Sequence, residues 1–320
     1  MATYDVSQLN AIVPPHWEKK VEQQLFQRSP FAKRQQMKGI KLKGGQYIRV
    51  PVHIVAVSSS MYGWHDRTDT ITLADATPVR AIDFPWTFIF GSMRIYQEDI
   101  LQYGESIKDL VTINIEEIAG QTSTTLSQGY YSGNPQADPT QINGLQTMLD
   151  LDGGGDSEYP GTASGITNTT YWAASVADGV DDITLLKIGQ RIDGCTFDME
   201  KPTAMFTQYS QWRKVWSLVQ PQQRYRDANM AKIGFDTLLL DANIPLFPDA
   251  QAQQMGGEDV IYILNEKYLH TWMHKDANPY KSPHIHVQTS FAWTQNILFM
   301  LAFGCNKRRA QGGIWGLSAT

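Results

Sequence analysis

The feature that most constrains the fold is a change of hydrophobic period between residues 82 and 126. Large apolar residues first stand at every second position, which predicts one face of a β-strand, at Ile82, Phe84, Trp86, Phe88 and Phe90. Apolar residues then recur mostly every three or four positions, which predicts one stripe of a helix, at Ile107, Val111, Ile115, Ile118 and Leu126. We expect this helix to run from about Ser106 to Gly129. An extended pair of strands followed by a solitary long helix is typical of a subunit that makes extensive contacts with its neighbours, rather than of an enzyme core.

The strand belongs to an expected long β-hairpin. Gly44 and Gly45 open it, and the rising strand is predicted over Tyr47–Val57, with Ile48, Val50, Val52 and Ile54 on one face. Pro51 lacks an amide proton, so it predicts an edge strand or a bulge. The tip, residues 58–78, is rich in Ser, Asp and Thr. It carries the candidate intersubunit contacts Trp64, Asp66 and Arg67.

The composition is poor in charge and rich in aromatic residues. At 320 residues the chain is long enough for one large domain or two small ones. Charged residues make up 18% and aromatic residues 11%. Two explanations stay open: other subunits cover much of the surface, or the core is large. Two distant cysteines, Cys195 and Cys305, predict buried reduced thiols and neither a disulfide framework nor a zinc site.

Positive charge is concentrated at the start of the chain. The first 50 residues hold nine Lys or Arg and three acidic residues, a net of +6, whereas the whole chain carries −5. Residues 51–320 therefore carry −11. Such a basic arm is suited to nucleic acid or to the acidic body of a neighbouring subunit. Because the arm lacks interleaved aromatic residues, we favour contact with a neighbour, with Arg28, Lys33 and Arg34 as candidates.

The remaining elements are shorter. A helix is expected at Pro15–Phe26, and the rest of the first 43 residues is expected to be irregular. Residues 131–170 are rich in Gly, Ser, Thr and Asn and predict loops. An α/β half follows. It has one helix capped by Asp181 or Asp182, with Leu185, Leu186, Ile188 and Ile192 on its apolar side, and a second from Thr207 to Pro221. Strands are expected over 204–206, 235–240, 244–247, 260–264, 289–303 and 314–317.

Two patterns resemble metal sites and fail on inspection. Four histidines lie within 17 residues, at His270, His274, His284 and His286. A zinc-protease helix needs Glu directly after the first His, and Thr271 stands there instead. The acidic segment 150–156 resembles a calcium loop. Its twelfth position is Gly161, which has no carboxylate. We therefore expect no metal ion.

Catalytic and cofactor motifs are absent from the sequence. The glycines at 153–155 are not followed by Lys-Ser/Thr, and no Gly-x-Ser-x-Gly elbow is present. No catalytic residue and no cofactor are therefore predicted. No targeting signal or apolar run of membrane-spanning length is visible, so we expect synthesis in a cytoplasm and no membrane partner.

The order of parts, together with several local sequences, resembles the major capsid proteins of tailed bacteriophages, the Hong Kong 97-type family. The matching segments are FPWTFIFGSMRIYQEDILQYG (84–104), GLQTMLD (144–150), KPTAMFTQYSQWRKVW (201–216), KIGFDTLLLDANIPLFPD (232–249), VIYILNEKYLHTW (260–272) and TSFAWTQNILFMLAFGCNKRRAQGGIWGL (289–317). The resemblance covers nearly the whole chain, and its specificity lies in the order of these segments. It departs from some members in having no Lys between Lys43 and Lys108, so a lysine cross-link from the hairpin is not expected.

The resemblance implies an α+β fold of the Hong Kong 97 type with four parts. Residues 1–40 correspond to the N-terminal arm and 41–97 to the extended loop, which lies over the neighbouring subunit. Residues 98–175 and 280–320 correspond to the peripheral domain with its spine helix. Residues 176–279 correspond to the axial domain.

The implied function is that of a structural head protein, not an enzyme. It would assemble as pentamers and hexamers into the icosahedral shell of a virion, around double-stranded DNA bound without sequence specificity. Portal, scaffolding and decoration proteins are the further expected partners. The alternatives are an encapsulin-type compartment shell, which resembles the same fold and encloses cargo, and a metal hydrolase built on the histidines.

Overall fold

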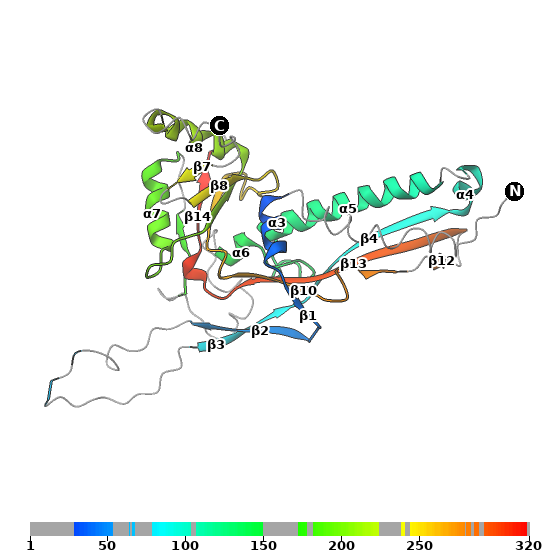
Figure 1. The fold of residues 1–320 in the computed structure, drawn as a ribbon, viewed down its shortest axis with the longest axis horizontal. Coiled ribbons are helices and arrows are strands. Elements are labelled where there is room, and N and C mark those ends of the chain that lie inside the picture. The colour runs from blue at the N-terminus through cyan, green and yellow to red at the C-terminus, as the bar shows by residue number, and fades with distance from the viewer. Residues whose placement is uncertain are drawn as a thin grey trace.

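The computed structural model describes residues 29–53, 64, 66–67, 79–103, 107–149, 172–177, 182–223, 238–240, 244–278, 280–282, 285–287 and 291–318. These residues form two six-stranded sheets and a separate two-stranded hairpin. Figure 1 shows an elongated molecule with the hairpin projecting to one side. The helix expected at 15–26, the tip residues other than 64, 66 and 67, and the segment 150–171 lie outside the described residues.

One sheet, which we call the long sheet, is organised around its longest strand. That strand, β13 (Ala292–Cys305), pairs antiparallel with β4 (Thr87–Tyr96) and β10 (Leu269–His274). Short strands complete the sheet: β1 (Ile40–Leu42) lies parallel to β10, and β11 (Tyr280–Lys281) and β12 (Ile285–Val287) pair with β13. The strand expected over 289–303 is thereby confirmed.

A single long helix, α5 (Ile107–Ser132), lies along one face of the long sheet after the short helix α4 (Gln97–Tyr103) (Figure 1). We call α5 the spine helix. Its expected stripe is confirmed where side chains are described, because Ile115 and Leu126 are buried. The weak helix formers near its end remain helical. Their hydroxyl groups donate to carbonyls one turn earlier, as Thr122 does to Ile118 at 2.8 Å.

The predicted single apolar face from Ile82 to Phe90 is wrong. The chain forms two strands, β3 (Val79–Pro85) and β4, which are separated at Trp86 and belong to different sheets. Phe84 is buried in β3, whereas Phe88 and Phe90 in β4 are 54% and 72% exposed. The alternation continues in sequence, but the packing partner changes at Trp86, so the even-numbered residues of β4 face away from the spine helix.

The root of the hairpin matches the sequence prediction. Strand β2 (Tyr47–His53) pairs with β3 over its whole length. Ile48 and Val52 are buried, and Pro51 is tolerated because each strand of a two-stranded ribbon has a free edge. Gly44 and Gly45 adopt φ of +122° and +130°, which other residues rarely adopt.

The second sheet, which we call the compact sheet, has the strand order β5-β14-β9-β6-β8-β7. Its strands are β5 (Ser175–Ala177), β6 (Ala204–Thr207), β7 (Leu238–Leu240), β8 (Ile244–Pro248), β9 (Asp259–Leu264) and β14 (Gly312–Leu317). Helices α7 (Leu185–Cys195) and α8 (Tyr209–Gln223) pack against it, and α6 (Leu145–Leu149) packs near the end of the spine helix. The expected strands of the α/β half are confirmed.

Details of the two expected helices differ. Thr184, not Asp181 or Asp182, caps α7, because its side chain accepts a hydrogen bond from the Lys187 amide. Leu186 is 71% exposed and is not part of the apolar side. Thr207 ends strand β6 rather than opening a helix, and α8 continues through Pro221.

Strand pairing crosses several of the expected part boundaries. Strand β4 falls within the range 41–97 expected for the extended loop and pairs with β13 in the long sheet. Strand β10 falls within the range 176–279 and pairs in the long sheet, while β14 falls within 280–320 and pairs in the compact sheet. The chain therefore passes between the two sheets more than once, and the four-part division remains a proposal.

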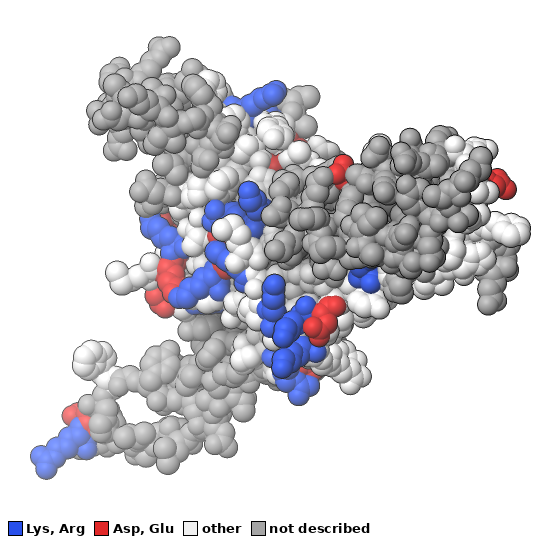
Figure 2. All heavy atoms as spheres, turned by 45° about the vertical axis from the view of Figure 1, so that its right-hand side comes forward, with Lys and Arg blue, Asp and Glu red and all other residues white. Residues whose placement is uncertain are grey.

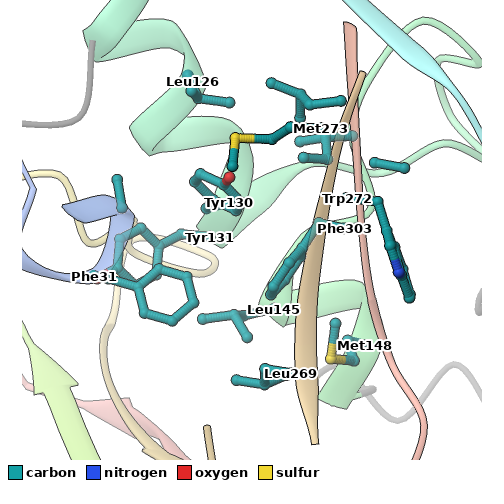
Figure 3. Close-up of a cluster of buried hydrophobic side chains, with 14 of the residues drawn as sticks. Phe31, Leu126, Tyr130, Tyr131, Leu145, Met148, Leu269, Trp272, Met273 and Phe303 are labelled. Carbon is teal, nitrogen blue, oxygen red and sulfur yellow. The ribbon is translucent and has the colours of Figure 1, made fainter. Parts of the chain in front are cut away.

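The arm contains a helix that the sequence analysis missed. Helix α3 (Pro30–Met37) begins after Ser29, whose side chain accepts a hydrogen bond from the Ala32 amide, with Pro30 at the first position. Phe31 is fully buried. Its ring centroid lies 5.7 Å from that of Tyr130, 5.1 Å from that of Phe206 and 6.1 Å from that of Phe303. Figure 3 shows Phe31 reaching from α3 toward the tyrosines of the spine helix.

We predict that Phe31→Ala lowers the free energy of unfolding by about 3–5 kcal/mol, since it opens a cavity where both sheets and the spine helix meet. Urea unfolding followed by circular dichroism measures the change. Phe88→Ala is the matched control, because that ring is 54% exposed and its loss from the isolated subunit should cost under about 0.5 kcal/mol. Equal losses in the two variants would show that α3 does not anchor the core.

Candidate assembly surfaces

The face of the long sheet opposite the spine helix exposes a group of apolar side chains. Register places Phe90 opposite Leu298, Leu298 opposite Tyr280, and Phe88 opposite Met300. Paired residues in a sheet share a face. Phe88, Phe90 and Tyr280 are each at least half exposed. We call this surface the platform, and it consists of Phe88, Phe90, Tyr280, Leu298 and Met300.

The strand that carries Phe88 and Phe90 has little exposed charge, since Arg94 is the one charged residue among the exposed positions of β4. Figure 2 shows the charged side chains of the described residues gathered in a few groups. A contiguous apolar surface of this kind is typical of a protein–protein contact. The sequence analysis missed it, because it assigned Phe88 and Phe90 to the same face as Phe84.

The hairpin tip presents the three candidate residues to solvent. Trp64 is fully exposed, and Asp66 and Arg67 are exposed beside it. The Asp66 carboxylate accepts a hydrogen bond from the Arg67 amide at 2.7 Å. A free Trp on a projecting loop is an apolar anchor of the kind that interfaces bury. The assignment of these residues to intersubunit contact stays a prediction.

The arm candidates are placed differently from one another. Arg34 donates to both carboxylate oxygens of Glu266 at 2.6 Å, and Lys38 donates to the same carboxylate at 2.8 Å. The Glu266 side chain is only 1% exposed. Arg34 therefore holds α3 against its own chain. Lys33 is exposed, and Arg28 lies outside the described residues.

Burial opposes the charged form of Glu266 and raises its pKa, but the hydrogen bonds from Arg34 and Lys38 outweigh this effect. The pKa of the carboxyl is therefore lowered overall. The ion pairs are stronger evidence for a fixed α3 than an exposed pair would be, since bidentate geometry is combined with a buried carboxylate.

The histidines do not form a metal centre among the described residues. His270 and His274 lie on strand β10 rather than on a helix, and burial lowers the pKa of His270. No group of three possible metal-ligating side chains occurs in the part of the chain that the structure describes. His284 and the acidic segment 150–156 lie outside that part.

Both cysteines are buried thiols outside any disulfide, as predicted. Burial raises the pKa of each thiol to about 12, so neither carries a thiolate at neutral pH. Their positions therefore fit packing and not nucleophilic chemistry.

Comparison with solved structures places these features in a known fold. The capsid protein of cyanophage A-1(L) superimposes with a TM-score of 0.58 at 12% identity, covering 87% of this chain and 89% of that one. The capsid of a native GTA particle gives 0.56 at 10% identity, covering 88% and 89%. The SrpI encapsulin of Synechococcus elongatus gives 0.53 at 9% identity, covering 100% and 98%.

The chain has the Hong Kong 97-type capsid fold. At these identities the likeness concerns the fold alone. No protein-family model and no curated protein matches the sequence. In the described residues, no helix has the length and apolar character needed to cross a membrane.

We predict that Glu266→Gln lowers the free energy of unfolding at pH 7 by about 1–3 kcal/mol, since charge-assisted hydrogen bonds are lost. The folded-state pKa is below the unfolded value of about 4.3, so the carboxylate contributes its stability above that pH. The gap between wild type and variant should therefore close as the pH falls below about 4. Urea midpoints measured from pH 3 to pH 7 test this, with the exposed Glu117→Gln as control. A gap independent of pH would contradict the ion-pair account.

Proposed function

We propose that this chain is the major capsid protein of a tailed bacteriophage, a structural protein and not an enzyme. It assembles as pentamers and hexamers into an icosahedral shell around double-stranded DNA, which it contacts without sequence specificity. Portal protein, and scaffolding or decoration proteins, are its further partners. The chain is made in the cytoplasm of the bacterial host and resides in the virion capsid.

One observation carries the proposal: the subunit has two apolar features that its own described core does not bury. Trp64 stands fully exposed on the hairpin, and Phe90 stands 72% exposed on the platform. The hairpin and the platform lie in different parts of the elongated molecule (Figure 1). Exposed surfaces of this kind are costly for a monomer in water. A hairpin that crosses the long sheet of the next subunit buries both at once.

Such a contact joins two different surfaces of the same chain. Repeated around an axis, a contact between unlike surfaces closes into a ring, which is the geometry that pentamers and hexamers require. In this arrangement residues 1–40 act as the arm and 41–97 as the extended loop. Residues 98–175 with 280–320 form the peripheral domain, and 176–279 form the axial domain.

The candidate contacts follow from these roles. Trp64, Asp66 and Arg67 touch the neighbouring subunit from the hairpin, and Lys33 with Arg28 touches it from the arm. Arg34 is the weakest of the candidates, because its Nε and Nη2 already donate to Glu266 of its own chain.

An encapsulin-type shell is the second candidate. The likeness to the SrpI encapsulin extends over 100% of this chain and 98% of that one, which supports a closed protein compartment without choosing its contents. The two functions differ in cargo, since a phage head encloses nucleic acid and an encapsulin encloses proteins that carry a docking peptide.

Electron microscopy of the purified protein tests assembly, and analysis of the particle contents separates the two candidates. We expect closed shells with five- and six-fold units, in which nuclease-protected DNA is found when the other head proteins are co-expressed. Shells that carry protein cargo and exclude DNA would support the encapsulin. A stable monomer at every salt concentration would contradict both.

We predict that replacing residues 60–76 with a short Gly-Ser turn leaves a folded subunit that forms fragile shells or none, because Trp64, Asp66 and Arg67 are exposed and polar loop tips tolerate replacement. Circular dichroism reports folding and microscopy reports assembly. The double variant F88S/F90S should give the same result, since it removes the platform. Ile113→Ser is the control, because Ile113 is 60% exposed on the spine helix rather than on the platform. Normal particles from the tip and platform variants would refute these two contact surfaces.

A further inference from the structure

A basic turn between the two sheets packs against a pair of aromatic rings. The turn, Lys307–Arg309, connects β13 to β14. The Lys307 ammonium lies 3.5 Å from the ring centroid of Phe197 and 4.9 Å from that of Tyr268, and the Arg309 guanidinium lies 5.2 Å from that of Phe197. These are cation–π distances. The rings therefore hold two cationic side chains in place.

The middle residue of the turn fixes its orientation. Arg308 points inward, is 1% exposed and donates from Nε to the carbonyl of Met148 at 2.6 Å. Its neighbours in sequence, Lys307 and Arg309, are both partly exposed. Because the turn is anchored, a ligand that binds these two cations loses less free energy to ordering the chain than it would on a free loop.

Two further cations complete the cluster. Lys267 lies 5.4 Å from the ring of Tyr268 and pairs with Glu200, and Lys201 follows Glu200 directly in the chain. We call the four cations the elbow patch: Lys201, Lys267, Lys307 and Arg309. The acidic residues beside them are Glu200 and Asp198, so the patch carries a formal +2 within a chain of net −5.

The charged groups of the elbow patch interact with one another. Burial has the largest effect on the pKa of Lys307 and lowers it, whereas Glu200 and Asp198 raise it and Lys267 and Arg309 lower it by less. The four cations outnumber the two acidic residues, and this formal excess of positive charge attracts an anion.

We propose that the elbow patch binds the phosphate backbone of double-stranded nucleic acid without sequence preference. Three of its four cations are lysines, point charges that suit phosphates at many orientations. Cations already lie over the rings of Phe197 and Tyr268, so the ring faces that they occupy are not available to stack on single-stranded bases. This proposal rests on the proposed function. It specifies which residues of the shell contact the nucleic acid inside it.

The competing occupant is an acidic surface of a second copy. That contact would bury Met199, which is 97% exposed on the turn beside the patch, whereas a phosphate backbone gains little from a thioether. Met199→Ala therefore separates the two occupants.

The test measures binding of a fluorescent 30-base-pair duplex of arbitrary sequence to the purified protein across a range of salt concentrations. The variant K201Q/K307Q/R309Q should bind at least about tenfold more weakly at low salt, and the slope of log K against log[salt] should become shallower by about 2 to 3. The control K41Q/R213Q/K275Q removes the same charge from exposed positions elsewhere and should lose much less affinity. Met199→Ala should bind the duplex as wild type does.

Microscopy of the same preparations keeps this inference apart from the proposed function. Normal shells from the elbow variant, together with weakened duplex binding, support the proposal. Unchanged duplex binding, or equal losses in the elbow and control variants, overturns it even if shells form. Loss of shells in both the elbow variant and Met199→Ala, with duplex binding retained, assigns the patch to a second copy. Failure of the wild type to form shells contradicts the proposed function, whatever the binding data show.

Discussion

The structure depends on the burial of one aromatic ring, Phe31, where three parts of the chain meet. Its contacts reach Tyr130 on the spine helix, Phe206 in the compact sheet and Phe303 in the long sheet. Polar contacts reinforce this junction, since the Asp249 carboxylate accepts hydrogen bonds from the hydroxyls of Ser29 and Tyr131. Both sheets pack against the same helix and the same ring. Because protein interiors are close-packed, we infer that the elongated subunit behaves as one rigid body.

The same packing leaves the platform and the hairpin residue Trp64 exposed, so both surfaces are open to contact with other molecules. Helix α3 fills the junction, and the spine helix covers one face of the long sheet. Among the described residues, no helix covers the platform on the opposite face. The hairpin root is packed through Phe84, whose ring lies 5.3 Å from that of Trp272, and it therefore projects from a fixed base. We propose that the hairpin of one copy lies on the platform of the next, which is a contact between two different surfaces of the same chain.

Sequence reasoning succeeded where the signal was local. The spine helix, the hairpin root and the strands of the compact sheet follow from periodicity within a few turns or strand pairs. It failed at α3, since Phe31 and Ala32 are the only apolar residues that this helix buries. Ser29 followed by Pro30 was the start signal that could have revealed it. It also failed at the platform, because the break at Trp86 depends on which sheet each strand joins. The partner of Arg34 is 232 residues away, and no local pattern announces such a pair.

The most direct test of the account is a cross-linking measurement on assembled particles of the double variant R67C/S92C, which keeps Trp64 and Phe90 and places thiols at exposed positions near them on the hairpin tip and on β4. The native thiols of Cys195 and Cys305 are buried and should not react. If the hairpin of each subunit lies on the platform of the next, a short bismaleimide should link neighbouring chains into closed rings, seen after denaturation as species of five and six subunits. Exclusive formation of unlinked or internally linked monomers, in particles that are otherwise intact, would contradict the account.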